Sequence, residues 1–171
     1  MADPAAARLN MVESQVRTAD VTDIRLHDAM RAIAREALLP ADKAHLAYAD
    51  IEAEYAPGRW LLKPRDVAKL LQALRPMPGE RALAIAAPYA AAVLERLGLS
   101  VQRLDGDDLA QPTGGPFDLI VSEAGNSTVS SYRLAGTGAA RVISASLPVG
   151  QGAAWLGGEL VYRLGVGVDH G

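Results

Sequence analysis

Residues 81–89 read Arg-Ala-Leu-Ala-Ile-Ala-Ala-Pro-Tyr, and this stretch decides the expected fold. The continuous apolar run over 81–86 is typical of a strand buried on both faces of a parallel sheet. Pro88 suits the first turn of a helix, which we expect over 89–97 with Gly98 as its stop. A strand followed at once by a helix predicts an α/β domain.

Working outward, the hydrophobic pattern predicts helices before this stretch and strands after it. We expect N-terminal helices over 5–18, 24–36 and 64–75, with loop-like residues over 40–63 that include a short turn of helix around 42–46. The expected later elements are strands over 100–104, 117–123 and 141–146, a helix within 126–136, and an antiparallel hairpin around 157–158. The chain is therefore expected to be one domain over 1–171, with a helical N-terminal region over 1–78 and a sheet core over 79–168.

Composition excludes several classes of function. The chain has 171 residues, a net charge of −3 and no Cys, which excludes disulfides, thiolate metal sites and a Cys nucleophile. Its mild acidity argues against nucleic-acid binding. No apolar stretch reaches the length of a membrane span, so we expect no membrane insertion. The three His residues lack metal-ligand spacing, and we expect no metal site. A soluble, cytoplasmic protein is expected.

A dozen collinear segments over about residues 10–166 resemble the protein-L-isoaspartate O-methyltransferases. The resemblance implies a Rossmann-like methyltransferase sheet of seven strands with an extra N-terminal helical region. It also implies methyl transfer from S-adenosylmethionine to the carboxylate of isoaspartyl residues in damaged proteins. The segments that carry it include Gln15-Val-Arg17, the Arg35-Glu36 pair, Ala47-Tyr48-Ala49-Asp50, Pro78-Gly79-Glu80-Arg81, Pro116-Phe117-Asp118-Leu119-Ile120-Val121 and Leu147-Pro148-Val149-Gly150.

The turn after the first sheet strand departs from the family pattern. There the family has an acidic residue and a glycine-rich turn, Glu-x-Gly-x-Gly-x-Gly in outline. Here Ala84 stands at the acid position, Ala86 and Ala87 replace glycines, and the turn is about two residues shorter. Pro88 removes a backbone donor. We expect a plain strand-to-helix turn. The alternative is a cofactor loop rebuilt from Ala86, Ala87 and Tyr89.

The segment after the second sheet strand gives a second departure. Asp105 ends that strand, where a Rossmann-type site keeps an acid for the ribose hydroxyls. It is either a surviving cofactor contact or part of a solvated Asp-rich turn, the interpretation we favour. Residues 105–116 are too few to supply a helical crossover and a further strand. We therefore expect the third strand of the family sheet to be absent.

The substrate side gives a third departure. The family carries Gly-x-Thr-x-Ser-x-Pro before its third helix, and this chain keeps Gly58 and Pro64 but has Trp60 and Leu62 at the hydroxyl positions. Leu cannot hold a carboxylate acceptor. Residues 60–62 are expected to plug the cleft, or else to offer an exposed apolar patch to a partner. Besides Gly58, the remaining substrate-side candidates are Val149 and Gly150.

Three sites depart from the family pattern: the turn after the first sheet strand, the segment after the second, and the substrate-side loop. Because the scaffold segments still match that pattern, the favoured hypothesis is a pseudoenzyme. It would keep the fold, bind no cofactor in the usual way, have no catalytic residue, and serve in binding or scaffolding with a protein partner or as a homodimer. The alternative is an active S-adenosylmethionine-dependent methyltransferase with a remodelled pocket. A third hypothesis is an unrelated ligand binder or hydrolase on a similar sheet.

Overall fold

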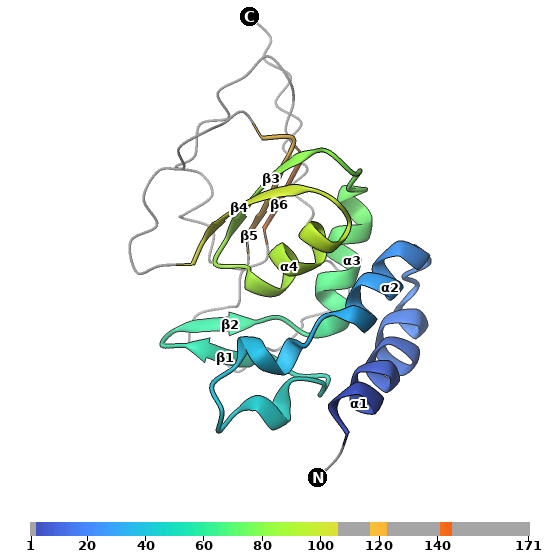
Figure 1. The fold of residues 1–171 in the computed structure, drawn as a ribbon, viewed down its shortest axis with the longest axis vertical. Helices are drawn as coiled ribbons and strands as arrows, with labels where there is room; N and C mark the ends of the chain where they lie inside the picture. Colours follow the sequence, from blue (N-terminus) through green and yellow to red (C-terminus); the bar gives the residue numbers. More distant parts are fainter. Residues whose placement is uncertain (1–2, 106–116, 123–140, 145–171) are drawn as a thin grey trace, which may run out of the picture.

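The computed structural model describes residues 3–105, 117–122 and 141–144. At its centre is a four-stranded parallel sheet in the order β4-β3-β5-β6 (Figure 1). The strands are β3 (Arg81–Ile85), β4 (Ser100–Leu104), β5 (Leu119–Ser122) and β6 (Arg141–Ser144). The expected α/β class with a Rossmann-like parallel sheet is confirmed, and each strand overlaps the range predicted for it.

Strand β3 lies inside the sheet because its side chains are apolar on both faces. Ala82 and Ala84 belong to the main core, whereas Leu83 and Ile85 belong to a second cluster with Ile120. All four β3 side chains are fully buried. The small alanines on one face allow the helices to approach the sheet closely, and the larger residues fill the other face.

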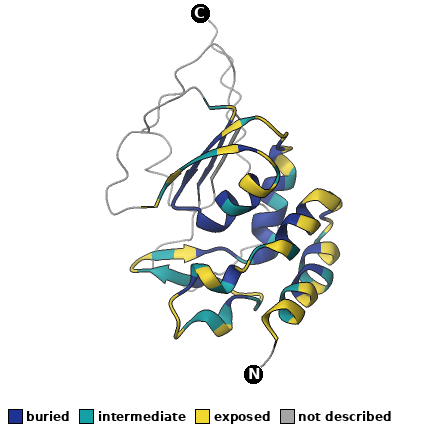
Figure 2. Ribbon diagram, viewed as in Figure 1, coloured by how far each residue is buried: buried dark blue, intermediate teal, exposed yellow. Residues whose placement is uncertain are grey.

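Helices from the N-terminal region cover one side of the sheet (Figures 1 and 2). The first helical stretch runs to Ala19 in three parts, the α-helix α1 (Pro4–Met11), the π-helical turn η1 (Val12–Val16) and the 3₁₀ turn η2 (Arg17–Ala19). Helix α2 (Ile24–Ala32) follows. Asp3 and Asp23 cap α1 and α2 by accepting backbone N–H groups of Ala5 and Arg25 at 3.0 Å.

Helix α2 ends earlier than the sequence pattern predicts. The expected end near Glu36 is wrong, because Ile33 is extended and a separate 3₁₀ turn, η3 (Arg35–Leu38), comes next. This break turns Arg35 into the core, where it is completely buried. Helical periodicity alone cannot show such a break, because both segments keep apolar residues at similar spacing.

The short helical turn expected around 42–46 is confirmed as the 3₁₀ turn η4 (Ala44–Leu46). The rest of the expected loop is wrong in part, because it contains a two-stranded antiparallel hairpin of β1 (Ala53–Ala56) and β2 (Arg59–Leu61). Gly58 lies in the hairpin turn at φ +70°. The strands are short, and only Ala53 and Leu61 are buried, so the sequence offers little alternation to detect.

One helix connects the hairpin to the sheet, and a second connects β3 to β4. Helix α3 (Pro64–Leu74) begins at the expected proline, and helix α4 (Pro88–Arg96) begins one residue before the range expected for it. On α3, Gln72 fixes the loop before α2, because its side chain accepts the N–H groups of Thr22 and Asp23 at 2.7 and 3.0 Å. Polar contacts therefore join α3 to the segment before α2 within the N-terminal region.

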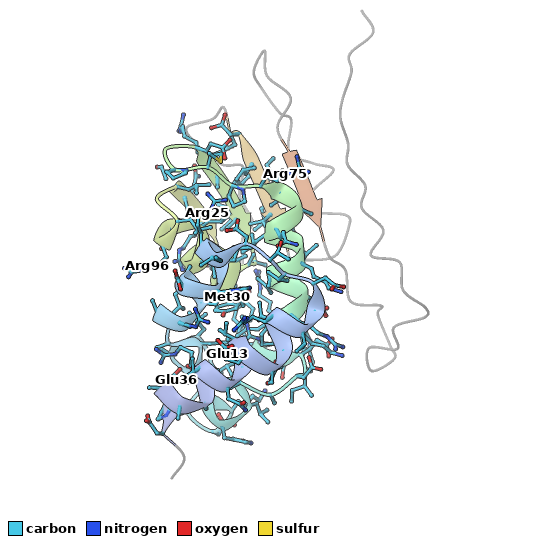
Figure 3. All side chains as sticks on the ribbon, turned by 90° about the vertical axis from the view of Figure 1, so that its right-hand side faces the viewer. Glu13, Arg25, Met30, Glu36, Arg75 and Arg96 are labelled. Carbon is cyan, nitrogen blue, oxygen red and sulfur yellow. The ribbon has the colours of Figure 1, made fainter. Side chains whose placement is uncertain are left out.

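A charged layer holds the N-terminal helices together (Figure 3). Glu13 of η1 pairs with Arg17 and with Arg31 of α2. The Tyr48 hydroxyl accepts from Arg8 Nε at 2.9 Å and donates to Glu36. Tyr48 is part of the resemblance to the methyltransferase family, and its contacts here are structural.

Several expectations concern residues outside the described part of the chain. These are the missing third strand, the helix within 126–136 and the C-terminal hairpin. Among the described strands β4 is at one end of the sheet, and its Arg103 forms a bidentate ion pair with Glu95 of α4 at 2.7 and 3.0 Å. No helix in the described ranges has the length and apolarity needed to cross a membrane.

Candidate functional site

The candidate site lies at the carboxyl edge of the parallel sheet, where α/β proteins of this type bind ligands. Strand β3 leads there into α4, and β4 ends there at Leu104, directly before Asp105. The β1–β2 hairpin lies below these strand ends, as Figure 1 shows. The residues singled out from the sequence therefore come from three segments that the fold brings to one edge.

The β3–α4 turn is short and built from buried alanines. Ala86 and Ala87 connect the strand directly to Pro88, the first residue of α4. Ala86 has φ +47°, the left-handed conformation that glycine adopts without strain. Its N–H donates to the Leu104 carbonyl at 2.8 Å, so this donor is already used. The turn keeps a glycine-like backbone at one position although its glycines are absent.

The residues of this turn do not fit S-adenosylmethionine as the family pattern would hold it. Ala84, at the acid position, is fully buried in the main core and has no polar group to offer a ligand. Ala87 and Tyr89 are also fully buried, and Ala86 is 4% exposed. Pro88 has no N–H to offer at the start of α4. These observations favour the plain strand-to-helix turn over a rebuilt cofactor loop.

Asp105 is exposed at the end of β4, the position of a ribose-binding acid in a Rossmann-type fold. Partial desolvation raises the pKa of its carboxyl, the positive charges of Arg103 and Arg59 oppose that rise, and Glu95 adds to it. Arg59 belongs to β2, so the hairpin and the sheet edge interact electrostatically at this point. The Asp-rich turn that forms the other interpretation continues into residues outside the described ranges.

The substrate-side positions divide between surface and core. Gly58 turns the hairpin, and its N–H donates to Glu54 at 3.1 Å. Leu62 is 5% exposed and belongs to the main core, as expected for a residue that closes a cleft. Trp60 is 40% exposed, so the expectation of a buried plug is wrong for this residue.

A buried arginine connects the two halves of the site. The Arg35 guanidinium donates to the Ala47 carbonyl at 2.8 Å and to the Leu62 carbonyl at 2.6 Å. It also lies 4.5 Å from the centre of the Tyr89 ring on α4. The substrate-side segment is thereby fixed against the start of α4. The resemblance contains Arg35, but its burial could not be read from the sequence, because buried arginines are rare.

Other candidates are structural or lie outside the described residues. His27 is buried with its Nε2 2.7 Å from the Val21 carbonyl, as expected for a packing histidine. Within the described ranges, His, Asp and Glu side chains form no group of three or more that could hold a metal ion. Val149 and Gly150 lie outside the described residues, so their proposed place on the substrate side stays a prediction.

Comparison with known proteins identifies the family. No family model matches the chain. Protein-L-isoaspartate O-methyltransferase from Methylorubrum extorquens is 34% identical over 154 residues, covering 74% of this chain and 68% of that protein. The enzyme from Methylorubrum populi is 38% identical over 151 residues, covering 72% and 71%.

A solved structure supports the fold independently. It is a beta-aspartate methyltransferase from Plasmodium falciparum in complex with S-adenosyl-L-homocysteine, with a TM-score of 0.60 and 14% identity. The match covers 81% of this chain and 84% of that chain. At that identity the likeness concerns the fold alone, whereas the two Methylorubrum proteins carry the assignment. The chain belongs to the protein-L-isoaspartate O-methyltransferase family.

Proposed function

We propose that this member has lost the binding of S-adenosylmethionine in the family's usual manner and serves as a binding or scaffolding protein. The observation that carries the proposal is the fully buried Ala84, which stands in the apolar core where the family pattern has an acid. The family pattern has a carboxylate there, a charged group that could accept hydrogen bonds at this edge of the sheet. Alanine provides neither the charge nor an acceptor.

The neighbouring turn supports the same proposal. Glycines allow a ligand to approach the backbone closely, whereas Ala86 and Ala87 place methyl groups along that path. The substrate side agrees, because Trp60 and Leu62 carry no hydroxyl that could orient an acceptor carboxylate. Three positions with separate chemical roles are thus occupied by side chains that cannot perform them.

The scaffold itself is retained. Arg35, Tyr48 and Gln15 keep structural contacts among the N-terminal elements, and Gln15 Nε2 donates to the Tyr48 carbonyl at 2.8 Å. A chain that keeps the family fold but lacks its cofactor-binding and substrate-binding residues is suited to a role in binding another protein. The proposed partner is a protein or a second copy of this chain, and size-exclusion chromatography with light scattering measures the second possibility directly.

One observation favours the alternative, an active methyltransferase with a remodelled pocket. Asp105 stands at the end of β4, and its position is that of the acid which contacts ribose in Rossmann-type sites. Under this alternative Asp105 would provide the main polar contact to the methyl donor, with the 149–150 segment on the substrate side.

Calorimetric titration with S-adenosyl-L-homocysteine separates the two proposals, with the Methylorubrum populi relative as the positive control. We expect no binding at micromolar affinity to this chain. Transfer of radiolabelled methyl groups to an isoaspartyl peptide is the second measurement, with no turnover expected above the blank at high protein concentration. Micromolar binding, or turnover that is lost in Asp105→Asn, would instead support the active enzyme.

A further inference from the structure

A buried carboxyl group lies in the first turn of α3. Asp66 is 7% exposed, and its Oδ2 atom is buried without a hydrogen-bond partner. The other carboxylate oxygen is 3.8 Å from Nε of Arg65, a distance too long for a strong charge-assisted hydrogen bond. Aspartate is almost never buried in this way unless it is paired, so its position calls for a physical explanation.

Residues 50–52, the segment before β1, add two more carboxylates where this segment meets the start of α3. We call this meeting point the junction. Glu52 has a buried Oε1 atom that also lacks a hydrogen-bond partner. Asp50 is 3.3 Å from Nη1 of Arg65, an ion pair that attaches this segment to the start of α3. Two buried carboxylate oxygens without partners thus occur where the hairpin entrance meets the helix.

The charges around Asp66 act in both directions. Its pKa is raised, first because burial removes water from the carboxylate and further because Glu52 and Asp50 repel a second negative charge. Arg65 and Lys63, the nearby cations, lower it. Desolvation and repulsion outweigh the attraction of these cations. The neutral form of Asp66 is therefore favoured by its surroundings more than for an ordinary aspartate.

We propose that Asp66 is a proton-operated latch at the hairpin entrance, which holds the 50–52 segment against α3 when neutral and loosens it when ionised. In the neutral form its hydroxyl can donate to a carboxylate oxygen of the facing segment. In the ionised form the junction holds three negative charges against Arg65 and Lys63. The latch requires no methyl donor, so it is independent of the proposed binding function.

The hairpin is suited to respond because it is anchored differently at its two ends. At the β2 end, the carbonyl of Leu62 accepts from the buried Arg35, a group that stays charged at any relevant pH. At the β1 end, Lys43 pairs with Glu54 at 2.8 Å, and the segment just before the strand is held by the Asp50–Arg65 pair and by the contacts around Asp66. A two-stranded hairpin is only marginally stable alone, so a change at one anchor is expected to move it.

Trp60 provides the reporter, because it lies on β2 and is partly exposed. In a Trp155→Phe background it is the sole tryptophan, and its fluorescence emission can be followed from pH 4 to 8. We expect a sigmoidal change whose midpoint lies above the ordinary aspartate pKa of about 3.9. Amide hydrogen exchange of 53–61, corrected for intrinsic rates, should increase through the same transition.

Matched variants decide whether Asp66 is responsible. Asp66→Asn should abolish the transition, while Glu52→Gln should move its midpoint to lower pH because one repulsive charge is gone. Asp42→Asn, which removes an exposed carboxylate elsewhere, should leave the midpoint unchanged. The latch is overturned if Asp66→Asn retains the transition, or if the wild-type protein shows none while circular dichroism reports a folded chain.

Discussion

Ala86 adopts a left-handed backbone, at φ +47°, without being a glycine. An L-residue with a side chain in this region is strained by roughly 1–2 kcal/mol, because its Cβ approaches the carbonyl oxygen. The strain is maintained by the register of the sheet, since the Ala86 N–H must reach the Leu104 carbonyl. The backbone at this position thus has a conformation that glycine favours, while the residue is alanine.

Ala86→Gly should therefore raise the free energy of unfolding, by up to about 1 kcal/mol, since relief of strain exceeds the added freedom of the unfolded chain. Urea unfolding followed by circular dichroism measures the change. The matched control is Ala84→Gly, two residues earlier in a buried strand, which should destabilise by about 0.5–1 kcal/mol or more. Equal destabilisation by both variants would show that Ala86 is not strained.

Asp66 gives a prediction about stability and pH. A carboxyl whose pKa is raised in the folded state binds its proton more tightly there than in the unfolded chain. It therefore contributes stability below the ordinary aspartate pKa, and this contribution is lost as pH rises through the raised value. Asp66→Asn should unfold at higher urea concentration than wild type at pH 7, with the difference shrinking toward pH 4. A difference that grows as pH falls would contradict this assignment.

At the scale of elements, Arg35 connects three segments that are not adjacent in sequence. Its guanidinium contacts the carbonyls of Ala47 and Leu62 and the ring of Tyr89. A single buried cation thus supports the residues before the hairpin, those after it and the first turn of α4. Its removal is expected to affect all three.

Arg35→Met should destabilise the protein by about 2–4 kcal/mol, because buried carbonyls lose their donors and the cation–π contact is lost. Arg35→Lys keeps the charge but not the planar fork, and should fall between Met and wild type. Thermal unfolding of the three proteins measures the order. If the Lys and Met variants were equally unstable, the ammonium group would be unable to replace either contact.

The elements that the sequence predicted best are those with a strong local signal. Strand β3 is a continuous apolar run, and α3 begins at a proline and buries four apolar residues at helical spacing. The β1–β2 hairpin was missed because its strands have four and three residues and little alternation in burial. Arg35 was predicted as part of a family pattern, but its burial depends on three distant segments.

The candidate site was predictable to a smaller extent. Ala84, Ala86 and Asp105 could be assigned to the sheet edge because strand ends follow from the strand ranges. The exposure of Trp60 could not, since the expected plug assumed a loop folding inward rather than a hairpin presenting alternate faces. Nor does any sequence pattern reveal the buried carboxyl of Asp66, which looks like an ordinary first-turn acid in a helix.

At the scale of the whole molecule, one core connects the N-terminal helices to the sheet. The main cluster includes Met11 of α1, Leu26 of α2, Leu61 of the hairpin and Val121 of β5. Side chains from opposite ends of the described chain therefore bury one another. Among the described residues, neither the N-terminal region nor the sheet face beneath it has a separate apolar cluster that could stabilise it alone.

If residues 1–171 form one domain, the N-terminal region and the sheet should unfold in a single cooperative transition. Because α2 packs on both α3 and α4, which lie against the sheet, its removal would expose apolar surface of the shared core, and the two regions should unfold together. Trp60 fluorescence in the Trp155→Phe background reports on the N-terminal region, and far-UV circular dichroism reports on the whole chain. The two urea transitions should coincide in midpoint and slope. A fluorescence transition that precedes the loss of ellipticity would mean that the hairpin region unfolds before the sheet.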